Sequence, residues 1–529
     1  MTDQKYYLKP NVQLEPLFNQ WYAWAHLISP ATAAMNIANS HLNIMQSFVR
    51  SPDIHAAAVK NPAMRGGPFL DVHPSRVNEI KQLIETTLST QGHMVEFAKA
   101  IKQLSELLAS EATGYSLEPL YEKVPEVLKG FIELVYDAAN QPSFRLIEGL
   151  LYKSEYYNPA AQTIALSLVS QDDRPFVFST PRLEDDQHLH LEIPFHDERI
   201  DKLFRMRTTP ETFGALKEFM GITNGNDDLL RSFLTEAEPP KPQRYDGDKV
   251  RIRYYGHACV LIESKDASVL TDPVISYSYP NDFERYTYLD LPESIDYVLI
   301  THSHSDHIMF ESLLQLRHRI KNIVVPRNNG GALEDPSLKL ALKNIGFENV
   351  IDIDDMETLK VKGGDIMGLP FLGEHADLNI RSKTAYLVRL AGTSVICAAD
   401  SSNLEPKLYQ HIRKEIGEVD VVFIGMECDG APLSWVYGPL LIKTINRKMD
   451  QSRRLSGSDF QRAMGILDHI PCKSAYVYAM GQEPWLGYVT SIKYTDESKP
   501  IVESNKLVEM CRSRGLQTER LLGTKELLL

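Results

Sequence analysis

Three histidines and one aspartate stand close together in the segment Thr301–His307, which reads THSHSDH. His302 and His304 are two positions apart and can converge on one cation, since imidazole is a good ligand for transition metals. Asp306 and His307 lie further round the same turn and favour a second ion. A polar loop that merely opens a helix would hold one or two such residues. The segment therefore predicts a site for two metal ions.

The residues before this motif are apolar and predict the strand that holds it. Tyr297–Ile300 reads YVLI, and a loop after a buried strand presents its side chains from a rigid platform. Arg251–Tyr255 and Ala258–Glu263 flank Gly256-His257 and predict a hairpin. Helices are predicted at 308–319, 335–345 and 404–416, and further strands at 268–270, 322–325, 385–390, 394–398, 419–424 and 473–479. This alternation indicates a layered α/β sandwich of sheets covered by helices.

A proline-rich segment separates this half of the chain from the first. Residues 236–248 read EAEPPKPQRYDGD, a composition typical of a linker. We therefore predict an α+β N-terminal domain over residues 1–240 and a second domain over residues 249–529. In the first domain, helices are predicted at 78–89, 94–108, 119–137, 196–205, 210–220 and 226–235, and strands at 163–169, 176–179 and 188–193.

Composition and charge argue against several classes of protein. The 56 basic and 70 acidic residues give a net charge of −14, which disfavours binding to nucleic acid or anionic lipid through bulk charge. The five cysteines are scattered and never spaced as C-x-x-C, so neither a disulfide framework nor a thiolate zinc site is indicated. Without a signal-peptide pattern or a long apolar run, we expect a cytoplasmic protein that binds neither nucleic acid nor membrane.

The motif at His302–His307 resembles the H-x-H-x-D-H signature of the metallo-β-lactamase superfamily. Tyr255–Ile262 and Leu270–Pro273 are similar to its first hairpin and its T-D-P turn. The resemblance covers roughly residues 249–490 and implies an αββα sandwich with a dinuclear metal site. The superfamily supplies three further ligands on loops after strands: a histidine, a metal-bridging aspartate and a last histidine. The corresponding positions here are Glu374-His375, Asp400 and His469, with His411 as a less attractive substitute for the last.

At Glu374-His375 a zinc hydrolase would be expected to present one histidine. Either side chain could be the ligand, because adjacent loop side chains usually cannot both reach one ion. However, the local sequence GEHADL and the spacing from His302 to Glu374 and on to Asp400 are similar to those of a branch of diiron β-hydroxylases, which includes the enzyme of chloramphenicol biosynthesis. In that branch glutamate takes this place. The large N-terminal module is also similar in layout.

This second resemblance implies a ligand set and a reaction. Metal one would have His302, His304, Glu374 and Asp400, and metal two would have Asp306, His307, Asp400 and His469. Oxygen donors such as Glu374 and Asp400, the two carboxylates expected to matter most in catalysis, stabilise an oxidised metal pair. The resemblance thus implies a non-haem diiron monooxygenase that uses O2 and hydroxylates an amino acid held as a thioester on a carrier domain of a nonribosomal peptide synthetase, as in antibiotic biosynthesis.

The partners implied are that carrier domain, an external electron donor and a second copy of the chain in a homodimer. No flavin, nicotinamide or iron–sulfur motif appears that could supply electrons. The N-terminal domain would serve in dimerisation or in carrier docking. The basic segment Asn446–Arg454 could dock an acidic carrier, or it could be a solvated loop beside a helix. The alternative function is a dinuclear zinc hydrolase of an ester, lactone or phosphodiester, with His375 as ligand and a metal-activated water.

Four further features are expected near the metals. His257 and Asp272 would either orient the ligands from beneath or serve only as turn residues. Glu427–Trp435 and Met480–Trp485 each follow a predicted strand, and their acidic, sulfur and aromatic side chains suit the wall of a pocket. Loop packing is the alternative for both.

Overall fold

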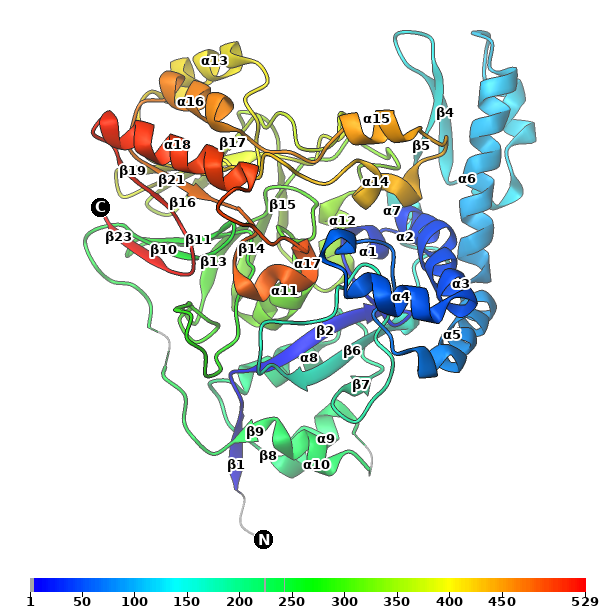
Figure 1. Cartoon of the computed structure of the whole chain (residues 1–529), viewed down its shortest axis with the longest axis horizontal. Helices are drawn as coiled ribbons and strands as arrows, with labels where there is room; N and C mark the ends of the chain where they lie inside the picture. The colour runs from blue at the N-terminus through cyan, green and yellow to red at the C-terminus, as the bar shows by residue number, and fades with distance from the viewer. Residues whose placement is uncertain (1–3, 223–224, 242) are drawn as a thin grey trace.

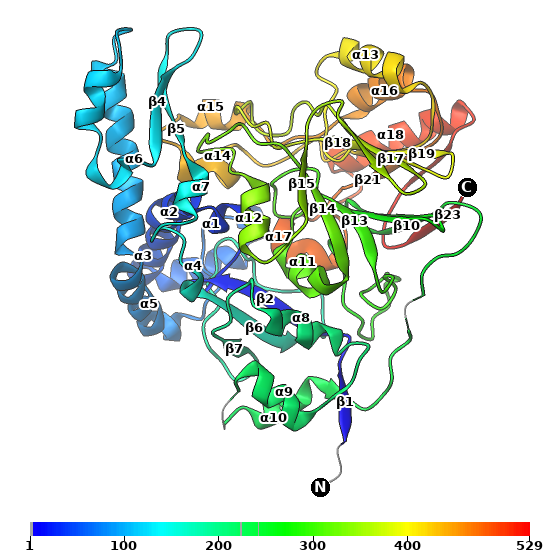
Figure 2. The ribbon, with the colours of Figure 1, turned by 180° about the vertical axis from the view of Figure 1, so that it is seen from behind.

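The computed structural model describes residues 4–222, 225–241 and 243–529, and its C-terminal half contains two seven-stranded sheets (Figures 1 and 2). The first has the order β15-β14-β13-β12-β11-β10-β23 and the second the order β16-β17-β18-β19-β20-β21-β22. The strands of the first sheet are β10 (Arg251–Gly256), β11 (Cys259–Glu263), β12 (Ser268–Thr271), β13 (Ile295–Leu299), β14 (Ile320–Pro326), β15 (Val350–Ile353) and β23 (Lys525–Leu528). Those of the second are β16 (Thr358–Val361), β17 (Gly364–Leu369), β18 (Ala385–Leu390), β19 (Thr393–Cys397), β20 (Val419–Gly425), β21 (Cys472–Tyr478) and β22 (Gln517–Arg520).

The two sheets pack face to face through apolar side chains such as Val260, Val388 and Val421. Helices cover the outer faces: α11 (Phe310–Leu316) and α12 (Leu338–Asn344) on the first sheet, and α13 (Pro406–Ile416), α16 (Phe460–His469) and α18 (Lys499–Ser513) on the second. Central strands such as β11 are buried on both faces, as their continuous apolar runs require. The predicted αββα sandwich is confirmed.

The N-terminal half is a mixture of helices and small sheets. A four-stranded sheet has the order β3-β2-β6-β7, a three-stranded one the order β8-β1-β9, and β4-β5 is a hairpin. These strands are β1 (Lys5–Leu8), β2 (Val12–Phe18), β3 (Trp21–Tyr22), β4 (Ile132–Tyr136), β5 (Pro142–Leu146), β6 (Gln162–Leu168), β7 (Leu189–Leu191), β8 (Glu211–Thr212) and β9 (Leu234–Thr235). The main helices are α1 (Ala25–Ile28), α2 (Pro30–Asn36), α3 (Leu42–Arg50), α4 (Pro52–Val59), α5 (Val77–Thr90), α6 (Gly92–Glu111), α7 (Glu148–Leu151), α8 (Glu198–Arg205), α9 (Phe213–Met220) and α10 (Asp227–Ser232).

Between β9 and β10, the described residues form neither helix nor strand, in the region of the predicted linker. Of that linker, residue 242 lies outside the described residues. None of the helices in the described ranges is long and apolar enough to span a membrane.

Two predicted elements in this half are wrong. The predicted helix at 119–137 consists of two short 3-10 turns followed by β4, because Pro119 and Pro125 interrupt helical hydrogen bonding. The predicted strand at 176–179 belongs to a loop. Its Phe178 packs instead against Trp24 and Trp435, so the aromatic side chains there serve tertiary contacts rather than a sheet.

The two halves share one continuous apolar core and a buried network of charges. Arg174 contacts Glu15 of β2 at 2.6 Å and Glu311 of α11 at 2.9 Å. Tyr22 donates a hydrogen bond to Glu311 at 2.9 Å, and Arg182 pairs with Glu15 at 2.7 Å. Because removing one partner of a buried charge pair is costly, this network fixes the N-terminal half against the sandwich.

Candidate metal centre

Side chains from several loops converge where strands of both sheets end. His302, His304, Glu374 and His375 form one group whose ligand atoms all lie within 4.8 Å of one another. His302, His307 and Asp400 form a second group by the same criterion, and His257, Asp306 and His307 a third. Six of the seven predicted metal ligands are thus brought together: His302 and His304 lie beside Glu374, His302 and His307 lie beside Asp400, and Asp306 lies beside His307.

Hydrogen bonds orient His302 and His307 from beneath. The Thr301 hydroxyl donates to Asp272 at 2.6 Å, and the Nδ1–H of His302 can donate to the Thr301 oxygen at 3.0 Å. His307 Nδ1 lies 2.8 Å from Asp272 and donates to it. Nε2 of each histidine thereby faces the site and is the nitrogen that would bind an ion; in His307 this atom lies 3.2 Å from Oδ2 of Asp400. Asp272 accordingly has the orienting role predicted as one of its two alternatives.

His304 faces the site through Nδ1, whereas His302 and His307 face it through Nε2. Its Nε2 lies 2.8 Å from the hydroxyl of the buried Tyr437, and its Nδ1 lies 2.6 Å from Oε1 of Glu374. When Nε2–H donates to Tyr437, Nδ1 carries the lone pair that can bind a metal. Tyr437 was not expected from the sequence, because α14 (Ser434–Tyr437) lies far along the chain from the histidine motif.

The loop after β17 brings both Glu374 and His375 to the site, contrary to the expectation that only one could reach it. Gly373, Glu374, Ala376 and Asp377 all have positive φ, between 52° and 79°, a left-handed conformation that is costly for residues other than glycine. This tight turn points two adjacent side chains the same way. His375 Nδ1 lies 2.7 Å from Oε2 of Glu374, and its ring stacks on His304 with centroids 4.6 Å apart.

His257 lies beside Asp306 and supports it. The backbone N–H of Gly481 donates to His257 Nδ1 at 3.1 Å, so the ring hydrogen is on Nε2, which lies 3.2 Å from Oδ2 of Asp306. No hydrogen bond of normal geometry joins the two atoms, and the ring lies beside the carboxylate in the position of an outer neighbour that supports a ligand. This agrees with the predicted supporting role of His257.

The structure contradicts the assignment of His469 as a ligand. His469 is the last residue of α16, just before β21 begins at Cys472. Asp400 lies at the other end of this sheet, since a Cβ on Gly425, the last residue of β20, would be 2.8 Å from its Oδ1. Strand β20 has 7 residues and spans about 20 Å. His469 precedes a strand, whereas Asp400 and Glu374 follow strands, and in the parallel pair β20 and β21 this puts it at the opposite end of the sheet.

Glu427 is a carboxylate at the site that the sequence analysis treated only as part of a pocket wall. It follows β20 and lines the same cavity as Asp400, Asp306 and Glu374. Burial raises the pKa of Glu427 well above its usual value, and the charges of these three carboxylates add to the rise. The sequence does hold a signal for Glu427: like Asp400, it lies on a loop that follows a strand, and the two strands are neighbours in the sheet.

Atoms without protein partners show that the site fits metal ions. His302 Nε2, Glu374 Oε2 and Asp400 Oδ1 are buried and have no hydrogen-bond partner in the described part of the chain. Burial lowers the pKa of His302 well below its usual value, helped by His307, so its ring is neutral and free to coordinate. For Glu374, burial alone would raise the pKa, but the neighbouring histidines outweigh it and hold the pKa well below the usual value. Neutral imidazoles and ionised carboxylates are the forms that bind cations.

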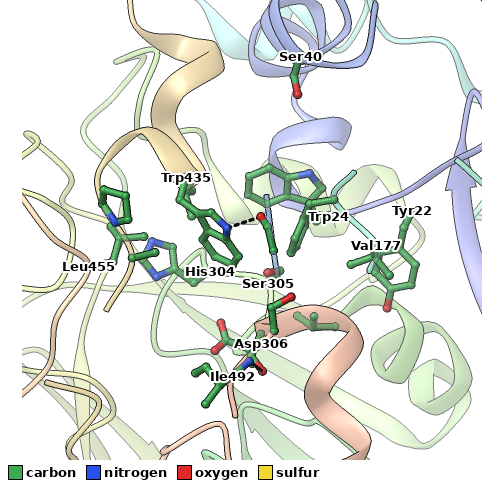
Figure 3. A pocket seen from close by; sticks show the side chains of 18 of the residues that line it. Tyr22, Trp24, Ser40, Val177, His304, Ser305, Asp306, Trp435, Leu455 and Ile492 are labelled. Atoms are coloured by element: carbon green, nitrogen blue, oxygen red, sulfur yellow. Dashed lines mark hydrogen bonds between the residues drawn. The ribbon is translucent and has the colours of Figure 1, made fainter. Parts of the chain in front are cut away.

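A cavity of about 330 Å³ leads from this site into the interface between the two halves of the chain (Figure 3). The sandwich contributes Glu427, Trp435 and the segment 489–492, and the N-terminal half contributes Trp24 and Phe178 among others. The predicted wall at 427–435 therefore lines the cavity. The predicted wall at 480–485 does not: Trp485 lines a separate, smaller hollow.

The fold and the ligand groups define a metallo-β-lactamase-fold protein with a dinuclear metal centre. Family models agree: residues 7–239 match the diiron non-heme β-hydroxylase N-terminal domain, and residues 251–439 match a β-lactamase superfamily domain. The chain is 38% identical over 525 residues, 98% of each chain, to the 4-amino-L-phenylalanyl-[CmlP-peptidyl-carrier-protein] 3-hydroxylase of Streptomyces venezuelae. It superimposes on the crystal structure of CmlA, a diiron β-hydroxylase from Streptomyces venezuelae, with a TM-score of 0.93, 38% identity and full coverage of both chains.

The chain belongs to the diiron non-heme β-hydroxylase family. It is therefore a hydroxylase, and its metal pair is iron. The comparisons favour this alternative over the zinc hydrolase.

Proposed function

We propose that this protein hydroxylates the β-carbon of an amino acid held as a thioester on a carrier domain of a peptide synthetase. The observation that supports this most directly is the cavity, which has the metal ligands at one end and is walled by both halves of the chain. Both halves align with a relative whose name states a carrier-bound aminoacyl substrate. A cavity at a domain interface suits a substrate that enters on a long arm.

The metal assignment we propose keeps six of the seven predicted ligands. His302, His304 and Glu374 would hold the first iron, Asp306 and His307 the second, and Asp400 would bridge them through its two oxygens. Glu427 stands close enough to add a fourth carboxylate to this charge environment. When bound, the iron pair supplies the oxidising chemistry that activates O2.

The protein's own side chains position and protect the reaction. Asp272 and Thr301 fix the rings of His302 and His307, and Tyr437 fixes that of His304. Phe178 contacts both Trp24 and Trp435 in the cavity wall, and these aromatic rings would exclude water from the substrate. A dry wall of this kind keeps the reacting carbon away from competing nucleophiles.

Helix α15 (Arg447–Ser452) is the surface we propose for carrier docking. Asp450 accepts hydrogen bonds from the N–H and hydroxyl of Ser434 at 2.8 and 2.9 Å, which places α15 against α14 and hence beside Trp435 in the cavity wall. Arg447 and Lys448 are exposed, whereas Arg453 and Arg454 donate to backbone carbonyls. The exposed pair therefore offers positive charge to an acidic carrier next to the cavity.

Reversing the charges of Arg447 and Lys448 tests the docking surface. Arg447→Glu with Lys448→Glu should weaken carrier binding about tenfold at low salt and less at high salt, since exposed charges act mainly through steering and are screened. Lys265→Glu, an exposed charge change on the sandwich, is the matched control. Equal carrier affinity for the double variant and the control, measured by fluorescence anisotropy, would move the docking surface elsewhere.

The remaining partners are also proposals. An external reductase would supply electrons, a second copy would pair through the N-terminal domain, and the protein would work in the reducing cytoplasm, where its five free cysteines would stay reduced. Mass determination in solution tests the dimer. Iron-loaded protein incubated with aminoacyl carriers, reductant and O2 tests the reaction: hydroxylated aminoacyl carrier supports it, and turnover of free amino acids alone would exclude the carrier.

A further inference from the structure

The end of the cavity remote from the metals carries polar groups that the proposed chemistry does not use. In Figure 3, Ser40 lies at the opposite end of the cavity from Asp306, with Trp24 and Trp435 between them. Trp21 and His41 also line the cavity. Trp21, Ser40 and His41 come from the N-terminal half, and we call these three residues the distal site.

The backbone at the distal site has an unusual form. Residues Ile37–His41 form a π-helical turn between α2 and α3. Such turns insert an extra residue into a helix and are frequent at functional sites, because they redirect side chains that a regular helix would place elsewhere. Here the turn ends on Ser40 and His41, the two residues that reach the cavity wall.

The polar atoms of the distal site lack partners. Trp21 is 1% exposed and His41 4% exposed, and their rings stack face to face with centroids 3.9 Å apart and planes 3° apart. The indole Nε1 of Trp21 and Nδ1 of His41 are buried without a hydrogen-bond partner in the described part of the chain. Leaving such groups unpaired costs free energy, although these two atoms are themselves sealed off from the cavity. The other nitrogen of His41 and the Ser40 hydroxyl are not sealed, have no hydrogen-bond partner in the described residues and belong to residues that line the cavity, so they are the groups with which a ligand can pair.

The chemistry of the distal site selects an uncharged ligand group. Burial lowers the pKa of His41 to about 3, so its ring is neutral at physiological pH and offers one donor and one acceptor. Trp21 can only donate, and the Ser40 hydroxyl can do both. The stretch between this site and the metals is lined by Trp24, Phe178 and Trp435, which suits a flat apolar group.

We infer that the distal site binds an uncharged hydrogen-bonding group of the aminoacyl carrier substrate, and so helps to determine which substrate is accepted. This inference rests on the proposed function. The group has amine, hydroxyl or amide chemistry, and two parts of such a substrate carry it: the end of an aromatic amino-acid side chain, or an amide of the pantetheine arm. Both would place a donor–acceptor group at the far end of an aromatic-walled passage.

His41→Phe tests the inference, because it keeps a ring to stack on Trp21 and removes both nitrogens. His318→Phe is the matched control, since His318 also has a buried, unpartnered nitrogen but does not line the cavity. Iron content and melting temperature show whether the metal end and the fold are intact. Affinities are measured for three carriers: unloaded, loaded with phenylalanine, and loaded with 4-aminophenylalanine.

If the group belongs to the side chain, His41→Phe should weaken binding of the 4-aminophenylalanyl carrier about tenfold, the value of one buried hydrogen bond, and leave the other two unchanged. If it belongs to the arm, all three affinities should fall together, while His318→Phe changes none. Unchanged affinities for His41→Phe, and for its combination with Ser40→Ala, would overturn the inference. A wild-type protein that binds none of the carriers would instead overturn the proposed function, and the inference with it.

Discussion

The two ends of the cavity come from different parts of the chain and are held in opposite ways. At the metal end, hydrogen bonds aim the ligand side chains, such as those between His307 and Asp272 and between His304 and Tyr437, and the unpartnered atoms are potential ligand atoms such as Nε2 of His302 and Oδ1 of Asp400. At the distal end, Trp21 and His41 have nitrogens without partners. The difference indicates that the metal end is completed by ions, whereas the distal end is completed by substrate.

Removing the carboxylate between the two metal groups should have the largest effect. Asp400→Ala is expected to lose at least one of two irons and to lower hydroxylation by about a thousandfold or more, since a bridging ligand serves both ions. Iron content and turnover are the measurements. Asp429→Ala, an exposed acid in the cavity wall, should keep both irons. Full iron content in Asp400→Ala would remove Asp400 from the ligand set.

Variants of the adjacent residues Glu374 and His375 show which of the two side chains is the metal ligand. Glu374→Ala is expected to lose the first iron, because it removes the one carboxylate that this ion does not share and leaves it only His302, His304 and the bridging Asp400. His375→Ala should keep both irons and lower turnover by about tenfold, since His304 would lose the ring that stacks on it at 4.6 Å while no hydrogen bond to Glu374 is removed. If His375→Ala lost iron while Glu374→Ala kept it, the histidine would be the ligand.

Weakening the support beneath the histidines should have a smaller effect. Asp272→Asn keeps the size of the side chain but removes the carboxylate that accepts from His307 and Thr301. Loss of such an outer partner typically weakens metal affinity by about 10–100-fold. Competition with a chelator measures this affinity. An unaltered affinity would give Asp272 only the structural role of a turn residue.

The junction between the two halves should respond weakly to pH. Glu148 of α7 accepts hydrogen bonds from the Ser337 N–H at the start of α12 and from Asn328, both at 2.8 Å. Burial outweighs these bonds and raises the pKa of Glu148 to about 7. Because the folded protein then holds this proton more tightly than the unfolded chain does, protonated Glu148 stabilises the fold. This contribution is complete below about pH 4.5 and is lost as pH rises through 7.

The melting temperature should therefore fall between pH 6 and pH 8, and less so in Glu148→Gln. The difference between the two proteins corresponds to about 1 kcal/mol in the free energy of unfolding, since one pKa unit is worth about 1.4 kcal/mol and Glu148 is only half-buried. An identical pH dependence in both proteins would assign the effect to other groups.

The contrast between the two ends also explains what the sequence could predict. His302, His304, Asp306 and His307 are contiguous, and Glu374 and Asp400 follow strands with clear apolar patterns, so the metal end could be read from local spacing. His469 was assigned by resemblance alone, although it precedes the predicted strand at 473–479 instead of following one, and the structure places it at the far end of β21. The joint approach of Glu374 and His375 depends on a run of left-handed backbone that no pattern announces.

The distal end was beyond prediction for a different reason. Trp21, Ser40 and His41 lie more than 250 residues before the motif they face across the cavity, and a π-helical turn has no periodicity of its own to recognise. Only the packing of the two halves, through Glu15, Arg174 and Glu311, brings them into one cavity.

The central claim is that this is a diiron hydroxylase of a carrier-bound amino acid. The most direct test reduces iron-loaded protein, adds an aminoacyl carrier and ¹⁸O-labelled O2, and follows the aminoacyl group by mass spectrometry. The account predicts two irons per chain and one labelled oxygen atom in the product, bound to the β-carbon. Two zinc ions, no uptake of label and metal-dependent release of the amino acid by hydrolysis of the thioester would contradict it.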